Sequence, residues 1–125
     1  MGHVAALAGF KSGQDWLDQV LVYLQKNRDF LESYLQEKMP AFGICKVEAT
    51  YLAWLNCRRT GIIKNLSEFF LQNARVALSN GEEFGQGGRG FVRMNFACPK
   101  ARLVQALDRM RVALQAAESN EPEQI

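Results

Sequence analysis

The sequence predicts an α+β domain, in which helices pack on one face of a small, mostly antiparallel sheet. Two segments, 12–39 and 99–117, carry apolar residues at helical spacing, and a third, 91–97, alternates apolar and polar residues as a strand does. The 125 residues are enough for one hydrophobic core, so we expect a single domain over residues 1–125.

Composition narrows the class of protein. The 15 lysines and arginines nearly balance the 13 aspartates and glutamates, and a net charge of +2 predicts neither nucleic acid nor a membrane as a partner. Three widely spaced cysteines, Cys45, Cys57 and Cys98, suit neither a disulfide framework nor a metal site. We therefore expect a cytoplasmic protein whose cysteines pack as small apolar residues.

The first ten residues lack a basic region and have too short an apolar run for secretion or for crossing a membrane. We interpret residues 1–10 as part of an interrupted helix. His3 lies in this segment and is the only histidine of the chain, so we expect a surface residue rather than a catalytic base or a metal ligand.

The first long helix should begin at Ser12, because Ser12 and Asp15 fit a capping box at the positive end of a helix. The helix should end before Pro40, since proline disfavours the helical conformation of the residue before it. Its apolar residues recur at spacings of three, four and seven and form one stripe: Trp16, Leu17, Val20, Leu21, Leu24, Leu31 and Leu35.

The middle of the chain predicts short strands around a short helix. Residues 44–47 suggest an edge strand, and 50–57, which are apolar on both faces, a central strand. Asn65 would cap a helix over 66–73 that buries Phe69 and Phe70, and 76–78 would form a brief strand. The exposed pair Arg58 and Arg59 would cap the end of the central strand in solvent.

Alternation over 91–97 predicts a strand with two different faces. One face would carry Val92, Met94 and Phe96, and the other Phe91, Arg93 and Asn95. A last helix should begin at Pro99, whose missing N–H is tolerated in a first turn, and should bury Leu103, Ala106, Leu107, Met110, Ala113, Leu114 and Ala117. Residues 119–125 would be a frayed tail.

The segment 81–95 is the candidate binding site. It contains Gly81, Gly85, Gly87, Gly88 and Gly90, half of the ten glycines, and leads directly into the strand that carries Arg93. Glycine permits positive φ and close approach of the backbone, and an arginine on a strand can hold a carboxylate or a phosphate through two parallel N–H donors. The segment therefore predicts an anion site.

Two other functional interpretations of this segment fit the sequence less well. A phosphate-binding loop or a dinucleotide fingerprint requires a helix next, whereas a strand follows here. The run Arg89 to Phe96 shares ends with an RNA-recognition motif, but Arg93 stands where that motif needs an aromatic residue. Two structural alternatives stay open: a mobile hairpin-like loop, and an Arg93 that forms an ordinary surface ion pair.

Several segments in order resemble one family: 15–17, 23–24 with 27–28, 48–56, 81–85 and 90–99, with Leu103, Ala106, Leu107 and Arg109. They are similar to the C-terminal small domain of class I and II (fold type I) pyridoxal-phosphate-dependent aminotransferases, and within these to the cystathionine β-lyase branch of carbon–sulfur lyases. The resemblance implies that residues 1–10 are the remnant of an inter-domain helix. Asn56 departs from the family's usual aspartate, which puts a local ion pair with Arg58 in doubt.

The resemblance also implies roles for residues. Arg93 would bind the α-carboxylate of an amino-acid substrate, with Phe84, Gly85 and Asn95 as supporting residues of the site. The parent enzyme would use pyridoxal phosphate for amino transfer or for β-elimination of a thiol. Its small domain would close over an active site formed with a large domain or a second subunit.

The family's Schiff-base lysine lies in a motif that none of the six lysines here matches: Lys11, Lys26, Lys38, Lys46, Lys64 and Lys100. We therefore expect this chain to hold no cofactor covalently and to be inactive alone. The alternative is a non-catalytic interaction or regulatory module derived from such a domain. That module would expose an apolar surface and self-associate through it.

Overall fold

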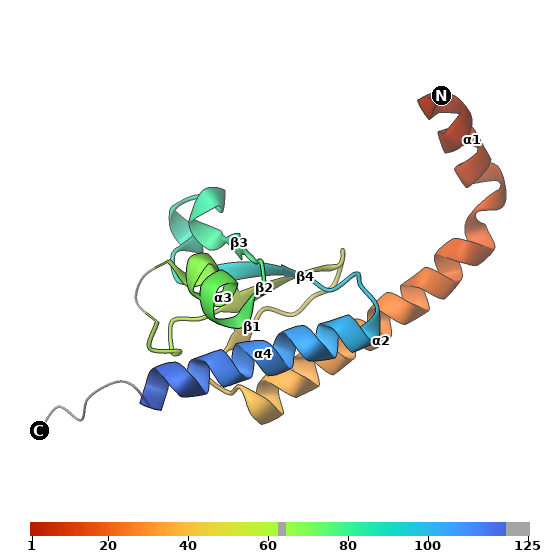
Figure 1. Ribbon diagram of the computed structural model, residues 1–125. Helices are drawn as coiled ribbons and strands as arrows, with labels where there is room; N and C mark the ends of the chain where they lie inside the picture. The colour runs from red at the N-terminus through yellow and green to blue at the C-terminus, as the bar shows by residue number, and fades with distance from the viewer. Residues whose placement is uncertain (63–64, 120–125) are drawn as a thin grey trace, which may run out of the picture.

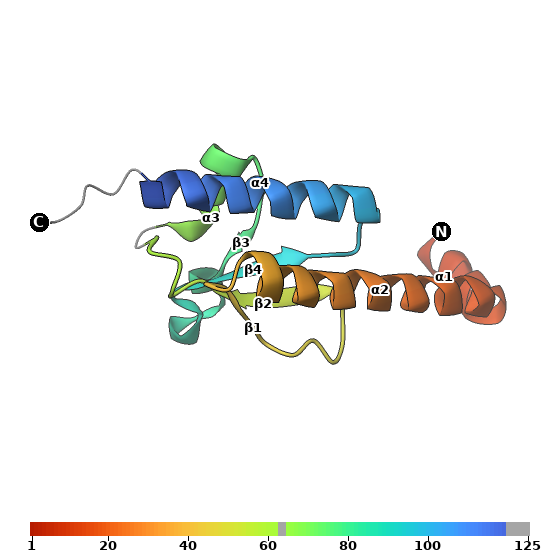
Figure 2. The same cartoon turned by 90° about the horizontal axis from the view of Figure 1, so that it is seen from below.

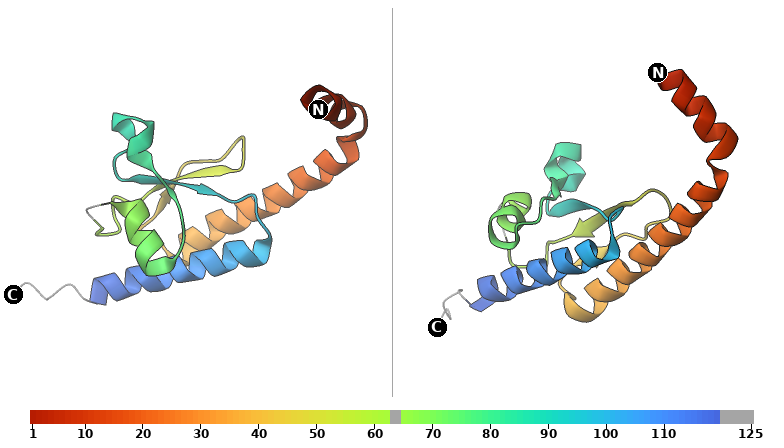
Figure 3. Two further views of the ribbon diagram at one scale, coloured as in Figure 1. Left: turned by 45° about the horizontal axis from the view of Figure 1, so that its top comes forward. Right: turned by 45° about the vertical axis from the view of Figure 1, so that its right-hand side comes forward.

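The computed structural model describes residues 1–62 and 65–119. Its elements, in chain order, are α1 (Gly2–Ser12), α2 (Gln14–Lys38), β1 (Gly43–Ile44), β2 (Leu52–Asn56), α3 (Leu66–Ala74), β3 (Ser79–Asn80), the 3-10 helices η1 (Gly81–Phe84) and η2 (Gln86–Gly88), β4 (Phe91–Asn95) and α4 (Lys100–Ser119). The strands form one antiparallel sheet in the order β1-β2-β4-β3. Helices α2, α3 and α4 lie on one side of this sheet (Figures 1 and 3), which confirms the predicted α+β class.

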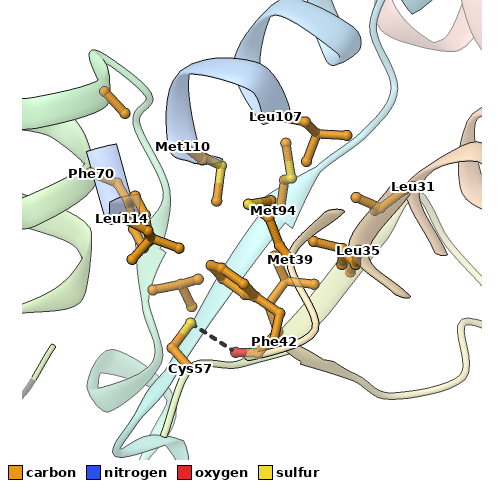
Figure 4. Packing of buried hydrophobic residues seen from close by; sticks show 14 of the residues in the cluster. Leu31, Leu35, Met39, Phe42, Cys57, Phe70, Met94, Leu107, Met110 and Leu114 are labelled. Carbon is orange, nitrogen blue, oxygen red and sulfur yellow. Dashed lines mark hydrogen bonds between the residues drawn. The ribbon is translucent and has the colours of Figure 1, made fainter. Parts of the chain in front are cut away.

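The core lies between the sheet and these three helices. Alternate residues of the two central strands, Ala53 and Leu55 in β2 and Val92 and Met94 in β4, are fully or almost fully buried. They pack with side chains from all three helices, including Leu103 of α4. Figure 4 shows others of this cluster: Leu31, Leu35, Phe70, Leu107, Met110 and Leu114. Burial of each large apolar side chain contributes about 1.5–3 kcal/mol, so this layer is the main source of stability.

The two halves of α2 differ sharply. Leu31 and Leu35 of its second half are buried, and this half lies beside α4 (Figure 2). In the first half, Trp16, Leu17 and Leu21 continue the same apolar stripe but are exposed. This half and α1 extend beyond the sheet (Figure 1). The stripe was predicted correctly, but only its second half is covered by residues that the structure describes.

The predicted capping box at Ser12 is wrong. Ser12 is the last residue of α1, and α2 begins at Gln14 after Gly13, without a side-chain cap. Gly13 makes the corner between the two helices, because a Cβ there would lie 2.5 Å from the carbonyl oxygen of Gly9. The end of α2 at Lys38, before Pro40, agrees with the prediction.

Other boundaries moved by a few residues. The central strand is shorter than predicted, and the edge strand is Gly43–Ile44 instead of 44–47. The strand predicted over 76–78 is wrong: the backbone pairs with β4 only at Ser79 and Asn80, opposite Arg93 and Val92. Asn65 does precede α3, yet its side chain hydrogen-bonds the Glu68 carboxylate instead of capping the backbone. Residues 120–125 of the predicted tail lie outside the described residues.

One buried amide holds the end of β4 against α2. The Nδ2 of Asn27 donates to the carbonyl oxygens of Phe96 at 3.0 Å and Cys98 at 2.8 Å. Nearby, the hydroxyl of Tyr23 accepts the backbone N–H of Lys100 at 2.7 Å, at the start of α4. These contacts fix the turn that leaves the strand carrying Arg93.

Candidate functional site

The candidate site lies on the face of the sheet away from the helices. Antiparallel pairing sets Trp54 of β2 opposite Arg93 of β4, and Asn56 opposite Phe91. On the other side of β4, Ser79 pairs with Arg93. The predicted alternation is confirmed, because Val92, Met94 and Phe96 are buried in the core while Phe91 and Arg93 are half-buried on the open face.

Arg93 is held by a hydroxyl and an aromatic ring. Its Nη2 donates to the Oγ of Ser79 at 3.3 Å, and its Cζ lies 4.5 Å from the centre of the Phe84 ring. Within residues 1–62 and 65–119, the ion pairs are Arg28 with Asp29 and Lys46 with Glu48, so Arg93 has no carboxylate partner there. The alternative of an ordinary surface ion pair is not supported, and most of the five guanidinium donors are available to a ligand.

Three aromatic rings connect Arg93 to a second arginine. Phe91 stacks on Trp54 with ring centres 5.4 Å apart, and Phe84 meets Trp54 edge-on at 5.6 Å. We call Phe91, Trp54 and Phe84 the aromatic column. The Cζ of Arg58 lies 4.8 Å from the Phe91 ring at one end, and Arg93 lies over Phe84 at the other.

The column was missed by sequence reasoning. Trp54 was assigned to a strand that is apolar on both faces, and its partner on β4 depends on a pairing register that the sequence does not state. The available signal was the spacing of Trp54 and Asn56, which share one face of the strand just as Phe91 and Arg93 do. The pairing register of β2 and β4 places these residues next to each other on one surface of the sheet.

The glycine-rich segment forms two 3-10 helices rather than a hairpin-like loop. Gly81 and Gly88 face each other so closely that a Cβ on Gly88 would lie 1.8 Å from the carbonyl oxygen of Gly81. Gly85 joins the two turns at a φ of 108°, and Gly90 enters β4 at a φ of 82°. This compact arrangement brings Phe84, which is 51% exposed, into T-shaped contact with Trp54.

The predicted supporting residues have different surroundings. Phe84 contacts Arg93 directly. Gly85 is exposed and contributes backbone geometry. Asn95 is exposed at the end of β4, and its Oδ1 accepts the N–H of Ala97 at 2.8 Å, so its carbonyl oxygen is engaged in a local turn. Of these three residues, Phe84 is the one whose side chain lies against the Arg93 guanidinium.

The predicted strand caps are both engaged. Arg58 donates through Nε and Nη2 to the carbonyl oxygen of Arg89 at 3.3 and 3.2 Å. Arg59 donates to the carbonyl oxygen of Pro40 at 2.9 Å. Both side chains are exposed, as predicted, but Arg58 also fastens the glycine-rich segment to the end of β2.

Three ionisable side chains among the described residues have a raised pKa: Tyr34, Cys57 and Cys98. Burial raises the pKa of the Cys57 thiol from 9.0 to about 12, and burial also raises the pKa of Cys98. Burial and a hydrogen bond to the Asp108 carboxylate raise the pKa of Tyr34. Cys57 packs in the core as predicted, whereas Cys45 is exposed, which contradicts the prediction for that residue.

Metal and membrane features are absent from the part of the chain that the structure describes. No cluster of three or more His, Cys, Asp or Glu side chains could hold a metal ion there. Among the same residues, no helix combines the length and the apolar character that crossing a membrane requires. His3 is exposed on α1, as predicted. Arg58 and Arg93 place one guanidinium group at each end of the column.

Comparison with known proteins places these residues in context. The model of the family "Aminotransferase class I and II" matches residues 3–110. A Mycobacterium leprae protein, provisionally named cystathionine beta-lyase, is 38% identical over 91% of this chain and 32% of its own length. The cystathionine beta-lyase PatB of Bacillus subtilis is 34% identical over 86% of this chain and 28% of its own.

A solved structure gives the same picture. A Corynebacterium diphtheriae protein, provisionally assigned as a PLP-dependent beta-cystathionase, superposes with a TM-score of 0.87 and 41% identity. The match covers 90% of this chain and 30% of that one. The chain therefore spans about a third of the length of the relatives it matches.

Proposed function

This chain belongs to the class I and II aminotransferase family, and from this membership we propose that it is the C-terminal small domain of a pyridoxal-phosphate-dependent aminotransferase or carbon–sulfur β-lyase. In this role it supplies half of a substrate clamp, with Arg93 as the residue that binds the α-carboxylate of an amino acid. The rest of the active site belongs to a large domain or a second subunit.

One observation carries the proposal: Arg93 is half-buried on an open sheet face, held from two sides, and has no carboxylate partner among the described residues. Ser79 and Phe84 restrict the guanidinium without neutralising it. A charge-assisted, bidentate hydrogen bond to a carboxylate would satisfy the remaining donors and orient the substrate. Phe84 and the backbone at Gly85 then serve as the support of this clamp, and Asn95 shapes the turn beside it.

The exposed apolar surface supports a missing partner. Phe10 on α1 is 92% exposed and Trp16 on α2 is 68% exposed, and Val4, Leu7, Leu17, Leu21 and Val22 are also exposed on these two helices. An exposed apolar surface of this kind is typical of a protein interface. Because the chain spans about 30% of its relatives, we assign this surface to contact with the large domain. In this proposal α1 is the remnant of the inter-domain helix.

The described lysines do not fit a covalent cofactor site on the open face. Lys100 lies over the Phe30 ring, Lys46 pairs with Glu48, and Lys11, Lys26 and Lys38 are exposed on α1 and α2. We therefore assign the open face to the substrate. The choice between amino transfer and thiol elimination rests on groups outside this face.

The carboxylate role can be tested on the chain itself. NMR would follow the Arg93 Nε–H signal during titration with sodium acetate, against sodium chloride at equal ionic strength. A saturable acetate-specific shift is expected. Arg93→Lys removes the Nε–H group itself, so acetate binding by this variant is followed through the backbone N–H signals of β4. Those signals should show weaker binding, because an ammonium cannot offer two parallel donors. Arg59→Lys is the matched control, since Arg59 donates to the backbone carbonyl of Pro40 and is not part of the aromatic column. An Arg93 signal that ignores acetate would contradict the proposal.

A hybrid enzyme extends the test to catalysis. This chain would replace the matching third of a full-length carbon–sulfur lyase, and Arg93→Lys would be compared with Arg59→Lys in the hybrid. Loss of a charge-assisted hydrogen bond worth about 1.5–3 kcal/mol should lower kcat/KM for an amino acid by about tenfold or more. Equal kcat/KM values for the two variants would exclude Arg93 as the carboxylate site.

A second candidate, a non-catalytic interaction or regulatory module, rests on the same exposed surface of α1 and α2. It predicts that the purified chain self-associates or binds a partner regardless of Arg93. Light scattering across concentration separates the candidates when combined with Phe10→Glu and Trp16→Glu. If these changes abolish a stable oligomer and leave acetate binding intact, both surfaces function independently. If the chain is monomeric and binds acetate, the clamp proposal alone is supported.

A further inference from the structure

Arg58 occupies the far end of the aromatic column from Arg93 and makes contacts of three kinds. Its guanidinium donates twice to the carbonyl oxygen of Arg89 and lies over the Phe91 ring. Its side-chain stem lies against Gly90, where a Cβ would come within 2.7 Å of the Arg58 Cγ. The Arg58 side chain thus contacts Arg89, Gly90 and Phe91, the residues around the start of β4.

The backbone under Arg58 is fixed as well. The N–H of Cys57 donates to the carbonyl oxygen of Gly90 at 2.8 Å, and the N–H of Arg58 donates to the Oδ1 of Asn56 at 3.1 Å. The segment from Arg89 to Phe91 is therefore attached to the end of β2 by main chain and side chain together. A planar guanidinium suits this position because one face can stack on a ring while its edge donates to a carbonyl.

The aromatic column connects this fixed segment to Arg93 across the open face of the sheet. Phe91 stacks on Trp54 with an interplanar angle of 15°, and Trp54 meets Phe84 at 84°. Offset and edge-on ring pairs attract each other beyond the effect of their burial, so a change at one ring alters the preferred position of the next. Phe84 is the ring under Arg93, and it stands on η1, next to the joining residue Gly85.

We propose that Arg58 is a positioning residue for Arg93, acting through Phe91, Trp54 and Phe84 to orient the guanidinium toward the substrate carboxylate. The inference rests on the proposed carboxylate role of Arg93. It adds that the carboxylate site is set by a second arginine at the opposite end of the column, which need not touch the substrate.

NMR of the unliganded chain tests the positioning directly. Ring currents from Phe84 should shift the Arg93 Nε–H signal away from that of an unstacked arginine. In Arg58→Ala this signal should move toward the unstacked position, although Arg58 has no direct contact with Arg93 in the structure. Arg59→Ala is the matched control and should leave the signal unchanged, because Arg59 donates to Pro40 and has no part in the column.

Acetate titration adds a functional readout. Loss of the positioning should weaken acetate binding by about two- to fivefold in Arg58→Ala, which is the fold-change that corresponds to an exposed cation–π contact. Arg58→Lys retains a cation over Phe91 but lacks the planar fork, so partial recovery of both readouts is expected. Arg59→Ala should bind acetate as the unmodified chain does.

The outcomes separate this inference from the proposed function. An unmoved Arg93 signal in folded Arg58→Ala overturns the positioning role, even if Arg93 binds acetate. An unmodified chain whose Arg93 signal ignores acetate overturns the carboxylate role instead. Should Arg58→Ala fail to fold by circular dichroism, Arg58→Lys and Phe91→Leu decide by the same criterion: a shifted Arg93 signal supports the positioning role, and an unmoved one overturns it.

Discussion

The two faces of the sheet are built from alternate residues of the same strands, yet they have different chemistry. Leu55 and Val92 point into a dry layer under three helices and are fully buried. Their chain neighbours, Trp54 and Arg93, are half-buried among rings and guanidiniums on the open face. The difference teaches that a shift of one residue along a strand separates the packed core from the proposed ligand-binding face. Substitutions on the two faces should therefore change different measurements.

The largest expected effect is on the covered face. Leu55→Ala should lower the free energy of unfolding by about 2–5 kcal/mol, because it leaves a cavity in a fully packed layer. Urea denaturation measures this change. Trp54→Leu is the matched variant on the open face, and it should cost less stability while shifting the Arg93 Nε–H signal more. If the two variants lose equal stability, the covered face is not the main source of stability, and the proposed difference between the faces is wrong.

The assignment of residues to the two faces of the sheet could largely be predicted from the sequence. Alternation over 91–97 predicted that Arg93 lies on the other face of the strand from Val92 and Met94, because the period of a strand fixes which residues share a face. The helical stripes of α2 and α4 likewise followed from spacing. These features depend on local geometry, which the order of residues encodes directly.

The parts that failed depend on contacts between distant segments. The strand predicted over 76–78 is displaced to Ser79 and Asn80, because pairing with Arg93 and Val92 decides where it lies. Ser12 does not cap α2, because α1 continues through it to the corner at Gly13. The aromatic column requires the register of two strands and the fold of a glycine-rich segment, and glycine has little conformational preference from which to predict it. Carboxylate binding by Arg93 came from family resemblance and stays a prediction.

The second effect concerns the support of the open face. Gly88→Ala should cost about 1–3 kcal/mol, because the new methyl group would overlap the carbonyl oxygen of Gly81 and force η1 and η2 apart. Since η1 carries Phe84, the Arg93 signal should move as well. Gly87→Ala is the control: a Cβ there has no neighbour within 4 Å and its φ is not positive. Equal effects of the two changes would mean that the close contact of Gly81 and Gly88 does not position Phe84.

The third expected effect, a pH dependence of stability, tests whether water is excluded from the covered face. Cys57 follows β2 and is fully buried, and burial raises the pKa of its thiol from 9.0 to about 12. The folded state therefore keeps a proton that the unfolded state loses above pH 9.0, so stability falls as pH rises from about 9 toward 12. At pH 10 the loss is about 1.4 kcal/mol, which corresponds to one pH unit above the unfolded pKa.

Denaturation at pH 8 and pH 10 measures the Cys57 effect, with Cys57→Ala removing the contribution of this thiol. Thiol labelling at neutral pH gives an independent check. Exposed Cys45 should react first, half-buried Cys98 later, and Cys57 only on unfolding. Rapid labelling of Cys57 in the folded chain would contradict a dry covered face.

The smallest effect is expected where the two faces meet at the end of β2. The Oδ1 of Asn56 accepts the N–H of Arg58, and Asn56→Asp would replace it with a charged acceptor next to the Arg58 side chain. An exposed pair contributes about 0.2–1 kcal/mol, so the variant should be slightly more stable at neutral pH. Pairing would lower the folded pKa of the new carboxylate, so the gain should be present above its unfolded pKa, about 4, and disappear as pH falls through the folded value.

A double-mutant cycle with Arg58→Ala separates the two sources of this gain. A gain that persists without the guanidinium comes from the backbone N–H of Arg58, and a gain that vanishes comes from ion pairing with its side chain. In the second case Asn56→Asp would also draw the Arg58 guanidinium away from Phe91 and Arg89, and the Arg93 signal should shift. A single added charge would then stabilise the end of β2 and at the same time make the Arg93 guanidinium less ordered. This outcome would be the clearest evidence that stability and the proposed carboxylate site depend on different contacts.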